Sequence, residues 1–396
     1  MRAEASPKSG LALWGGGFRP FFLAAALYAS VLVPGWVAIW LAVVPAPAWL
    51  WPSAWHAHEM LFGVVAAAIA GFLTTSVPVW TSTRALAGAP LAALFAIWLA
   101  GRVAMVFAGR VSAGFVAAID LAFLPALALV LARALVPARQ PRNLGFLPVL
   151  AALWLCNAAV HAQALGFAWP ASQALRLAVD LVVVLIVVIG GRITPAFTRN
   201  ALAREGVDAP VRSRPWLDRA AIAAAVALAV ADLLAPRTRV SGVVAGIAAV
   251  ALAGRMLRLA DAPHGPRSAA LVAACGARVG RGRLRAGRRL RPRGCAALAG
   301  RASRALRGRD GSDAARGHDA VALGHTGRAL VLPRGAVICY VLVHLGALLR
   351  VTATAMPASP PALLVAAGVS WAGAFALYAA LYAPILCAPR VDGRPG

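Results

Sequence analysis

The chain has 396 residues, of which 61% are hydrophobic and 13% are charged, and its formal net charge is +26. Soluble domains average about 45–50% apolar and about 25% charged residues, so this composition excludes an ordinary soluble protein. Repeated apolar runs of about 20 residues instead predict a polytopic membrane protein. The runs are continuous rather than alternating, so they favour an all-α transmembrane helix bundle over a barrel.

Ten apolar segments follow a polar, Gly-rich start that lacks the pattern of a cleavable signal peptide. They span residues 20–44, 60–79, 88–108, 112–132, 145–167, 171–190, 217–234, 240–258, 331–350 and 362–386. Each is long enough to cross a bilayer as a helix.

Loop charges predict the orientation of these segments. Arg2, Lys8 and Arg19 precede or open the first segment, whereas the next loop, "PAPAWLWPSAW", has no charge and three tryptophans. The loop 191–216 carries five arginines. Cytoplasmic loops are enriched in Lys and Arg, so we expect a cytoplasmic N-terminus in the bacterial inner membrane.

Four histidines fall toward the outer side in this topology. His56 and His58 lie in "WHAHEMLFG" (55–63), His161 lies near the outer end of the fifth segment, and His344 lies in the outer half of 331–350 if an even number of segments fills 259–330. Imidazole is a common ligand of copper and haem iron. A single histidine in a bundle more often hydrogen-bonds a neighbouring helix, and that alternative stays open, chiefly for His161 and His344.

The spacing of His56 and His58 restricts their geometry. On a helix, side chains two residues apart point in nearly opposite directions, whereas in an extended segment they share a face. Either the chain is not yet helical at His56, or the two histidines serve different partners. On a helix, His56 would share a face with Glu59 and Met60.

Other polar residues inside apolar segments are functional candidates. Asp120 and Asp180 are intramembrane carboxylates, which suit proton carriers or ligand partners. Arg192 follows Gly190 and Gly191; it is an interfacial anchor or, alternatively, a partner for a propionate or another anion. The five cysteines form no CxxC pair, so a zinc or redox-dithiol site is not indicated.

Six motifs together resemble those of a known family. In chain order they are "GFRPFFL" (17–23), "WHAHEMLFG" (55–63), "GFLTTSVPVWT" (71–81), "WLAGRV" (98–103), "GGRITPAFTRNAL" (190–202) and "LGHTGRAL" (323–330). They resemble the NnrS family of twelve-helix bacterial membrane proteins. The resemblance implies haem and copper and a role linked to nitric oxide and denitrification.

The resemblance frames the functional hypothesis. We expect a haem–copper integral membrane protein of nitric oxide metabolism, denitrification or nitrosative-stress response, whose partners are membrane lipid and nitric oxide or a redox partner. The alternatives are a metal-free transporter or permease, or an inactive copy. Candidate metal ligands are the four outer histidines, and candidate cofactor-binding residues are Glu59, Met60, Arg19, Arg192 and His325. Catalytic residues cannot be assigned from these motifs.

One block does not fit the family pattern. Residues 267–316 carry fourteen arginines, which cannot cross a bilayer because each costs about 2.5–3.5 kcal/mol at its centre. The block lacks the interleaved aromatic residues of a nucleic-acid arm, so no nucleic acid is expected as a partner. It is either a basic cytoplasmic loop or an out-of-frame stretch: read one base later, codons for Ser303–Leu306 can encode the family's "HAL". We therefore divide the chain into 1–263 (spans one to eight), 264–321 (the block, in place of spans nine and ten) and 322–396 (spans eleven and twelve).

Overall fold

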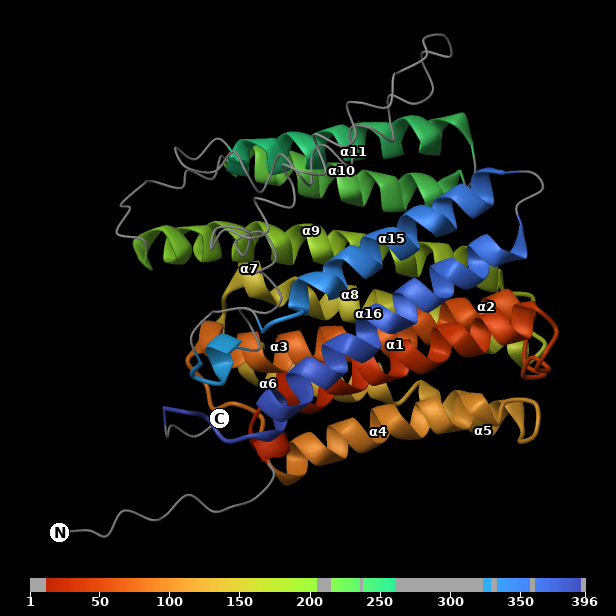
Figure 1. Cartoon of the computed structure of the whole chain (residues 1–396), viewed down its shortest axis with the longest axis horizontal. Coiled ribbons are helices and arrows are strands. Elements are labelled where there is room, and N and C mark those ends of the chain that lie inside the picture. Colours follow the sequence, from red (N-terminus) through yellow and green to blue (C-terminus); the bar gives the residue numbers. More distant parts are fainter. Residues whose placement is uncertain are drawn as a thin grey trace. The chain divides into compact units, whose positions relative to one another are not determined.

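The computed structural model describes residues 12–204, 215–235, 238–260, 323–328, 333–356 and 360–392; of 193–204, 253 and 255–260 it describes only the helical backbone. The described residues form helices and no strands (Figure 1). The predicted all-α bundle is therefore confirmed. The arginine-rich block, including its proposed frame shifts, lies outside the described residues.

The helices belong to two compact units, 1–181 with 321–396, and 182–320. The elements of the first unit, with α9 continuing into the second, are η1 (Ala12–Gly15), α1 (Phe18–Trp40), α2 (Pro52–His58), the π-helical η2 (Glu59–Val65), α3 (Ala66–Thr81), α4 (Ala89–Val106), α5 (Ala113–Asp120), α6 (Phe123–Ala138), α7 (Pro141–Leu144), α8 (Phe146–Ala164), α9 (Ala171–Arg204), α15 (Ala336–Ala355) and α16 (Pro361–Cys387). The second unit adds α10 (Pro215–Leu234) and α11 (Arg239–Ala260). Within this unit, Val184 and Val187 of α9 pack against Ala221 and Ala225 of α10.

Eight helical segments of the described chain are long and apolar enough to cross a membrane. They coincide with eight of the ten segments expected from the sequence. The expected segments 217–234 and 240–258 are also helical, as α10 and α11. Helix α10 carries Asp218, Arg219 and Asp232, so every stretch of 18 residues within it includes three charged side chains.

Two segments are interrupted near each other in the first unit. The second crossing runs from α2 through η2 into α3, and the π-helical turn Glu59–Val65 sits inside it. The fourth crossing breaks between Asp120 and Phe123, where α5 ends and α6 begins. Pro125 fits the first turn of a new helix but not the middle of an old one, which explains the break. Both interruptions lie beside buried polar side chains.

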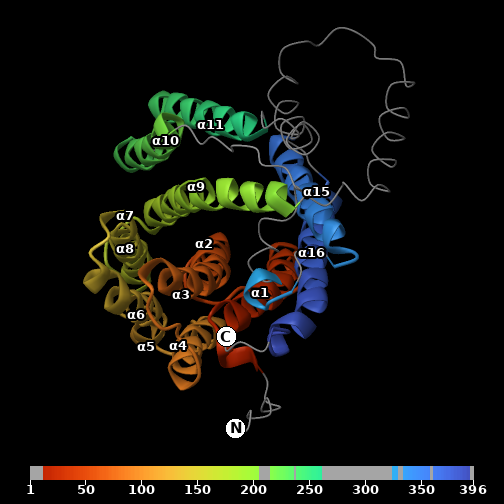
Figure 2. The same ribbon diagram turned by 90° about the vertical axis from the view of Figure 1, so that its left-hand side faces the viewer.

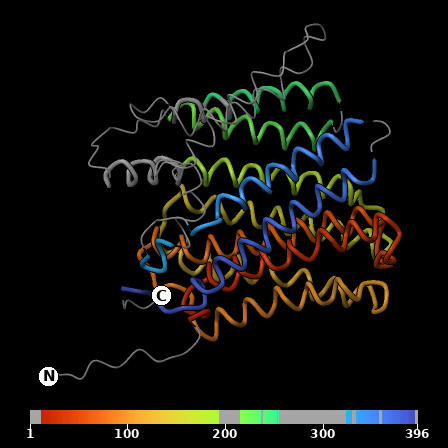
Figure 3. Tube along the Cα trace, in the orientation of Figure 1, coloured from red at the N-terminus to blue at the C-terminus, as the bar shows by residue number. Residues whose placement is uncertain are grey.

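Packing around α1 organises the first unit. Figure 2, viewed roughly along the helices, shows α1 between α3 and α16, and both neighbours contact it. The trace in Figure 3 shows α16 beside α1 and α15 beside α16. Helices α2 and α5 lie at the end opposite to the start of α1 and the end of α16 (Figure 1).

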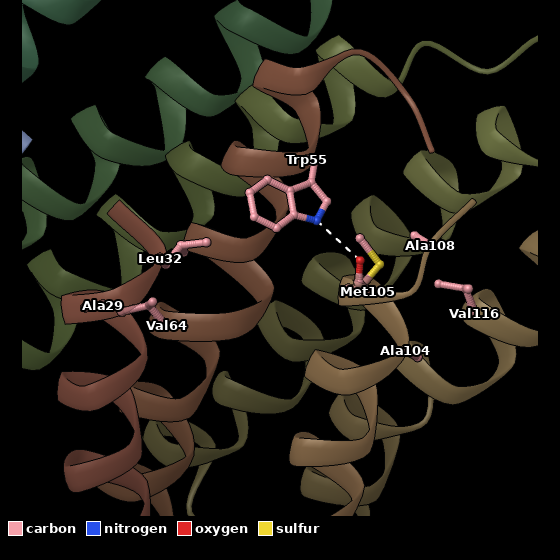
Figure 4. Close-up of a cluster of buried hydrophobic side chains, with 8 residues drawn as sticks. All are labelled: Ala29, Leu32, Trp55, Val64, Ala104, Met105, Ala108 and Val116. Carbon is pink, nitrogen blue, oxygen red and sulfur yellow. Dashed lines mark hydrogen bonds between the residues drawn. The ribbon is translucent and has the colours of Figure 1, made fainter. Parts of the chain in front are cut away.

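A hydrophobic cluster packs between the helices at this end of the unit. Its buried members are Ala29, Leu32, Trp55, Val64, Ala104, Met105, Ala108 and Val116 (Figure 4). The Trp55 indole Nε1 points to the Met105 carbonyl oxygen and donates a hydrogen bond of 3.4 Å. In a membrane such packing is favoured by van der Waals contact between the helices, because lipid tails are as apolar as these side chains. The cluster thereby fixes α2 and η2 against α4 and α5.

Candidate metal centre

A group of polar side chains is buried beside this hydrophobic cluster. We call it the polar cluster; its members are Tyr28 of α1, His58 of α2, Glu59 of η2, Arg102 of α4, Asp120 of α5, and Asn157 and His161 of α8. His58 and Glu59 are 0% exposed, His161 is 1% exposed and Asp120 is 3% exposed. Ionisable side chains at such positions are costly unless they are paired, so their arrangement needs a reason.

Arg102 joins the two carboxylates of the cluster. Its Nη1 donates to Glu59 Oε1 at 2.5 Å, and its Nη2 donates to Asp120 Oδ1. The other oxygen of Glu59 accepts a hydrogen bond from the Tyr28 hydroxyl. The planar guanidinium suits this forked contact better than an ammonium group would. Three helices and the π-helical turn are thus linked through one cation.

His58 lies between oxygen atoms on both sides of its ring. Its Nδ1 is 2.9 Å from Glu59 Oε1, and its Nε2 is 2.8 Å from Asn157 Oδ1 and 3.2 Å from Asp120 Oδ2. The Asn157 amide donates its Nδ2 to Asp120 Oδ2, which leaves its oxygen facing the imidazole. A neutral imidazole has one N–H only. His58 therefore either carries a second proton or uses Nε2 to bind a cation.

The charge balance of the cluster also indicates that an additional proton or cation is bound. Two carboxylates face one guanidinium, so one negative charge is left over when both imidazoles are neutral. An unpaired buried charge is strongly unfavourable. One added positive charge, either a proton on an imidazole or a singly charged cation, would complete the balance; a divalent ion would leave one positive charge over.

Three residues of the cluster have the spacing of metal ligands. His58, Asp120 and His161 each offer one ligand atom, and these atoms lie within 4.8 Å of one another. Two imidazoles and a carboxylate suit several transition metals, among them copper, zinc and non-haem iron. Glu59 Oε1 can accept the Nδ1–H of His58, an arrangement that commonly orients metal-binding histidines. His161 Nε2 is 2.9 Å from Asp120 Oδ2, and its buried Nδ1 has no hydrogen-bond partner in the described chain.

Glycines leave room for the cluster. A Cβ added at Gly63, inside the π-helical turn, would lie 2.7 Å from Tyr28 Cε1 and 3.2 Å from Arg102 Nη1. One added at Gly101 would lie 3.0 Å from Asp120 Oδ1. The 2.7 Å contact would force the Tyr28 ring to shift, and the other two would crowd Arg102 and Asp120, so the helices carry glycine beside the polar groups.

The predicted histidines separate into different surroundings. The chain is helical from Pro52, so His56 and His58 point apart, as the second of the two alternatives requires. His56 stacks on Trp36, with ring centroids 4.6 Å apart, while His58 enters the polar cluster. His344 is exposed on α15, and its Nδ1 lies 2.7 Å from the Tyr340 carbonyl oxygen. The structure thus brings together only His58 and His161 of the four candidate ligands.

The candidate cofactor-binding residues are also dispersed. Glu59 belongs to the polar cluster, whereas Met60 is half-buried and packs against the hydrophobic cluster of Figure 4. Arg19 is buried and donates from Nη1 to the carbonyl oxygens of Leu386 and Ala388, each at 2.7 Å. It therefore caps the end of α16.

The last two candidates lie elsewhere. Arg192 is half-buried in α9. His325 packs its ring against Phe18, with centroids 5.6 Å apart, and Arg390 donates to its backbone oxygen. Burial, followed by the nearby Arg390 charge, lowers the pKa of His325.

Sequence reasoning missed three members of the polar cluster. Arg102 lies in the "WLAGRV" motif, and an arginine inside an apolar segment signals a buried counter-ion. Asn157 lies four residues before His161, a spacing that puts both on one helix face. Tyr28 gave no comparable signal, because a tyrosine in an apolar segment is common.

Comparison with known proteins identifies one family. The family model described as NnrS protein matches residues 12–277 and 320–390. The intervening residues 278–319 lie within the arginine-rich block. No curated protein and no solved structure matches the chain.

Proposed function

The chain belongs to the NnrS family, and on that premise we propose that it is a haem- and copper-containing protein of the bacterial inner membrane that acts in nitric oxide metabolism, denitrification or the response to nitrosative stress. The single observation that carries the metal proposal is the group His58, Asp120 and His161, whose ligand atoms lie within 4.8 Å of one another. Its N and O donors fit copper, zinc and iron alike, and the family resemblance leads us to propose copper for this site.

The chain's own residues have defined roles in this proposal. His58 and His161 supply Nε2 and Asp120 supplies Oδ2 as ligands, while Glu59 holds the His58 ring by its Nδ1–H. Arg102 holds the two carboxylates in position through Nη1 and Nη2. Bound copper would supply a redox-active centre for a small ligand such as nitric oxide. Haem is implied by the family alone, since the described residues identify no axial ligand for it.

The orientation follows from the loop charges. With the start of α1 on the cytoplasmic side, the polar cluster lies toward the outer side of the membrane, because α2 and α5 lie at the opposite end of the unit (Figure 1). The membrane-crossing helices contact lipid. A small ligand or redox partner would therefore reach the cluster from outside the cytoplasm.

A metal-free transporter is the second candidate. The same cluster is balanced if His58 binds a second proton, and buried carboxylate–histidine groups occur in proton-coupled transporters. The two candidates differ in metal content, so one measurement separates them.

The test is metal analysis of purified variants. We expect His58→Ala and His161→Ala to lose copper while remaining in the membrane, because each removes one of three ligands. His344→Ala is the matched control, since it is exposed and lies outside the cluster. His56 is the other candidate ligand of the motif, and the Soret band of His56→Ala tests whether the Trp36-stacked imidazole holds haem. Full copper content in both His58→Ala and His161→Ala would contradict the copper site and favour the metal-free transporter.

The arginine-rich block supports a further part of the proposal. The family match omits 278–319 and resumes at residue 320, close to the end of the block, although it still includes 264–277. We therefore propose that 264–321 is out of frame and replaces spans nine and ten, which would make this an impaired copy. Sequencing the coding DNA tests it directly. A restored-frame protein that matches the present chain in yield and Soret absorbance would show that the block is a tolerated loop.

A further inference from the structure

One aromatic residue covers the polar cluster from the loop between α1 and α2. Trp49 contacts the rings of both cluster histidines in T-shaped geometry, with centroids 5.0 Å from His58 and 5.2 Å from His161. Both imidazoles are fully buried, whereas Trp49 is half-buried. Trp49 therefore stands between the two imidazoles and the surface.

The backbone beside Trp49 is fixed by the turn between α4 and α5. Gly109 in that turn has φ +86°, and a Cβ added to it would lie 2.4 Å from the Ala48 carbonyl oxygen. Only glycine fits both the left-handed conformation and this close approach. Trp49 also packs against the hydrophobic cluster that includes Trp55 and Met105. The loop thus rests on a neighbouring turn that a single added methyl group would push away.

Polar atoms on either side of this contact lack partners. Trp49 Nε1 and His161 Nδ1 are both buried with no hydrogen-bond partner in the described residues. Buried polar atoms normally have a partner. A small hydrogen-bonding molecule that entered here would find a donor on the indole and a second polar atom on the imidazole.

We propose that Trp49 is the cover of the polar cluster and determines how fast ions and small polar molecules reach His161 from the loop side. The cover consists of the indole ring, seated by Gly109 through Ala48. Displacing the ring opens the cluster, and restoring an aromatic ring of similar width closes it again. This inference builds on the proposed metal centre but predicts a property of the polypeptide that metal-free protein also has.

The test is chemical labelling of histidine in detergent-purified, metal-free protein. Diethyl pyrocarbonate carbethoxylates unprotonated imidazole nitrogens, and peptide mass spectrometry gives the rate at each histidine. N-acetylhistidine added to each reaction serves as the reference for reagent activity, because His344 lies within the membrane-crossing helix α15 and detergent covers it. We compare the unmodified chain with Trp49→Ala, Trp49→Phe and Gly109→Ala. Trp51→Ala is the matched control, because Trp51 is in the same loop, is 38% exposed and has no recorded contact with either cluster imidazole in the described chain.

We expect Trp49→Ala to raise the His161 labelling rate by about tenfold or more, since opening no longer breaks the packing of a large aromatic ring. Gly109→Ala should raise it in the same direction with Trp49 present. Trp49→Phe and Trp51→Ala should label about as slowly as the unmodified chain. An unchanged His161 rate in both Trp49→Ala and Gly109→Ala, or an equal rise in Trp51→Ala, would overturn the proposal.

Two further outcomes distinguish an incorrect role for Trp49 from unfolding of the variant and from the absence of a metal site. If Trp49→Ala unfolds, all its histidines label at the rate of N-acetylhistidine, and the comparison then rests on Trp49→Phe and Gly109→Ala. If the chain binds no copper, the labelling result is unaffected because no metal is present in the assay. Slow His161 labelling that rises in Trp49→Ala, in a chain that binds no copper, would support the role of Trp49 and contradict the proposed metal centre.

Discussion

Arg102 and Arg19 are two buried arginines of the same compact unit, and their surroundings differ in kind. Arg102 is 4% exposed and donates to carboxylates of Glu59 and Asp120. Arg19 is 0% exposed and donates to backbone carbonyl oxygens at the end of α16. The Arg19 contacts complete a helix end. The Arg102 contacts bring two carboxylates together beside two imidazoles, which is the arrangement that a metal-binding or proton-carrying site requires. Burial of an arginine alone therefore does not identify a site.

The largest effect is expected when Arg102 loses its charge. Arg102→Leu leaves two buried carboxylates without their cation, and breaking a buried pair costs about 3–5 kcal/mol. We expect a large fall in thermal stability in detergent. Arg102→Lys is the control: it keeps the charge but loses the forked contact, so it should lose less. If Arg102→Leu were as stable as the unmodified chain, the carboxylates would have to be protonated in the folded protein.

Arg19 gives the contrasting result. Arg19→Met removes the two hydrogen bonds from a charged group to carbonyl oxygens, and we expect a loss of about 1.5–3 kcal/mol in the free energy of unfolding. Copper content per folded protein should not change, because Arg19 has no contact with the polar cluster among the described residues. A loss of copper or of a Soret band from well-folded Arg19→Met would instead support the cofactor role predicted for Arg19.

A smaller effect is expected from crowding Arg102. In Gly63→Ala the new Cβ meets the Tyr28 ring and Arg102 Nη1, and overpacking of this kind costs about 1–3 kcal/mol. Gly35→Ala is the matched control in α1, since nothing lies within 4 Å of its Cβ position. It should be neutral or stabilising by roughly 0.5–1 kcal/mol. Equal melting temperatures for the two variants would show that the π-helical turn is looser than its contacts indicate.

The smallest effect concerns His325, near Arg19. Its pKa is lowered by burial and by Arg390, so the unfolded chain binds this proton more readily than the folded protein does. Its contribution is present above the unfolded pKa of about 6.5 and is lost as the pH falls from there toward the folded value. His325→Gln should therefore reduce the difference in melting temperature between pH 7.5 and pH 5.5. An unchanged difference would mean that other groups govern the acid sensitivity.

Hydropathy predicted the helices well but not their interruptions. Segments 60–79 and 112–132 were predicted as single helices, yet the first starts at Pro52 and contains a π-helical turn, and the second is broken after Asp120. A hydropathy window averages over about 19 residues and so does not detect a one-residue insertion or a turn. Both interruptions place polar side chains that the cluster uses.

The candidate site was only partly predictable for a related reason. A histidine or carboxylate in an apolar segment is conspicuous, which led to His58, His161 and Asp120. Which helix faces meet depends on tertiary packing, so the exposure of His344 and the pairing of Arg102 with Glu59 could not be read from the chain. The position of a residue in the sequence predicts its depth in the membrane. It does not predict which neighbouring helix its side chain faces.

The π-helical turn Glu59–Val65 makes the chain unusually sensitive to a change of length. Removing one residue from the turn would convert it to α-helix and rotate everything before it by about 100° relative to α3. His58 would swing out of the cluster, and His56 would turn away from Trp36, although neither residue had been altered. An alignment that counts a single gap here as harmless would therefore miss the loss of the site.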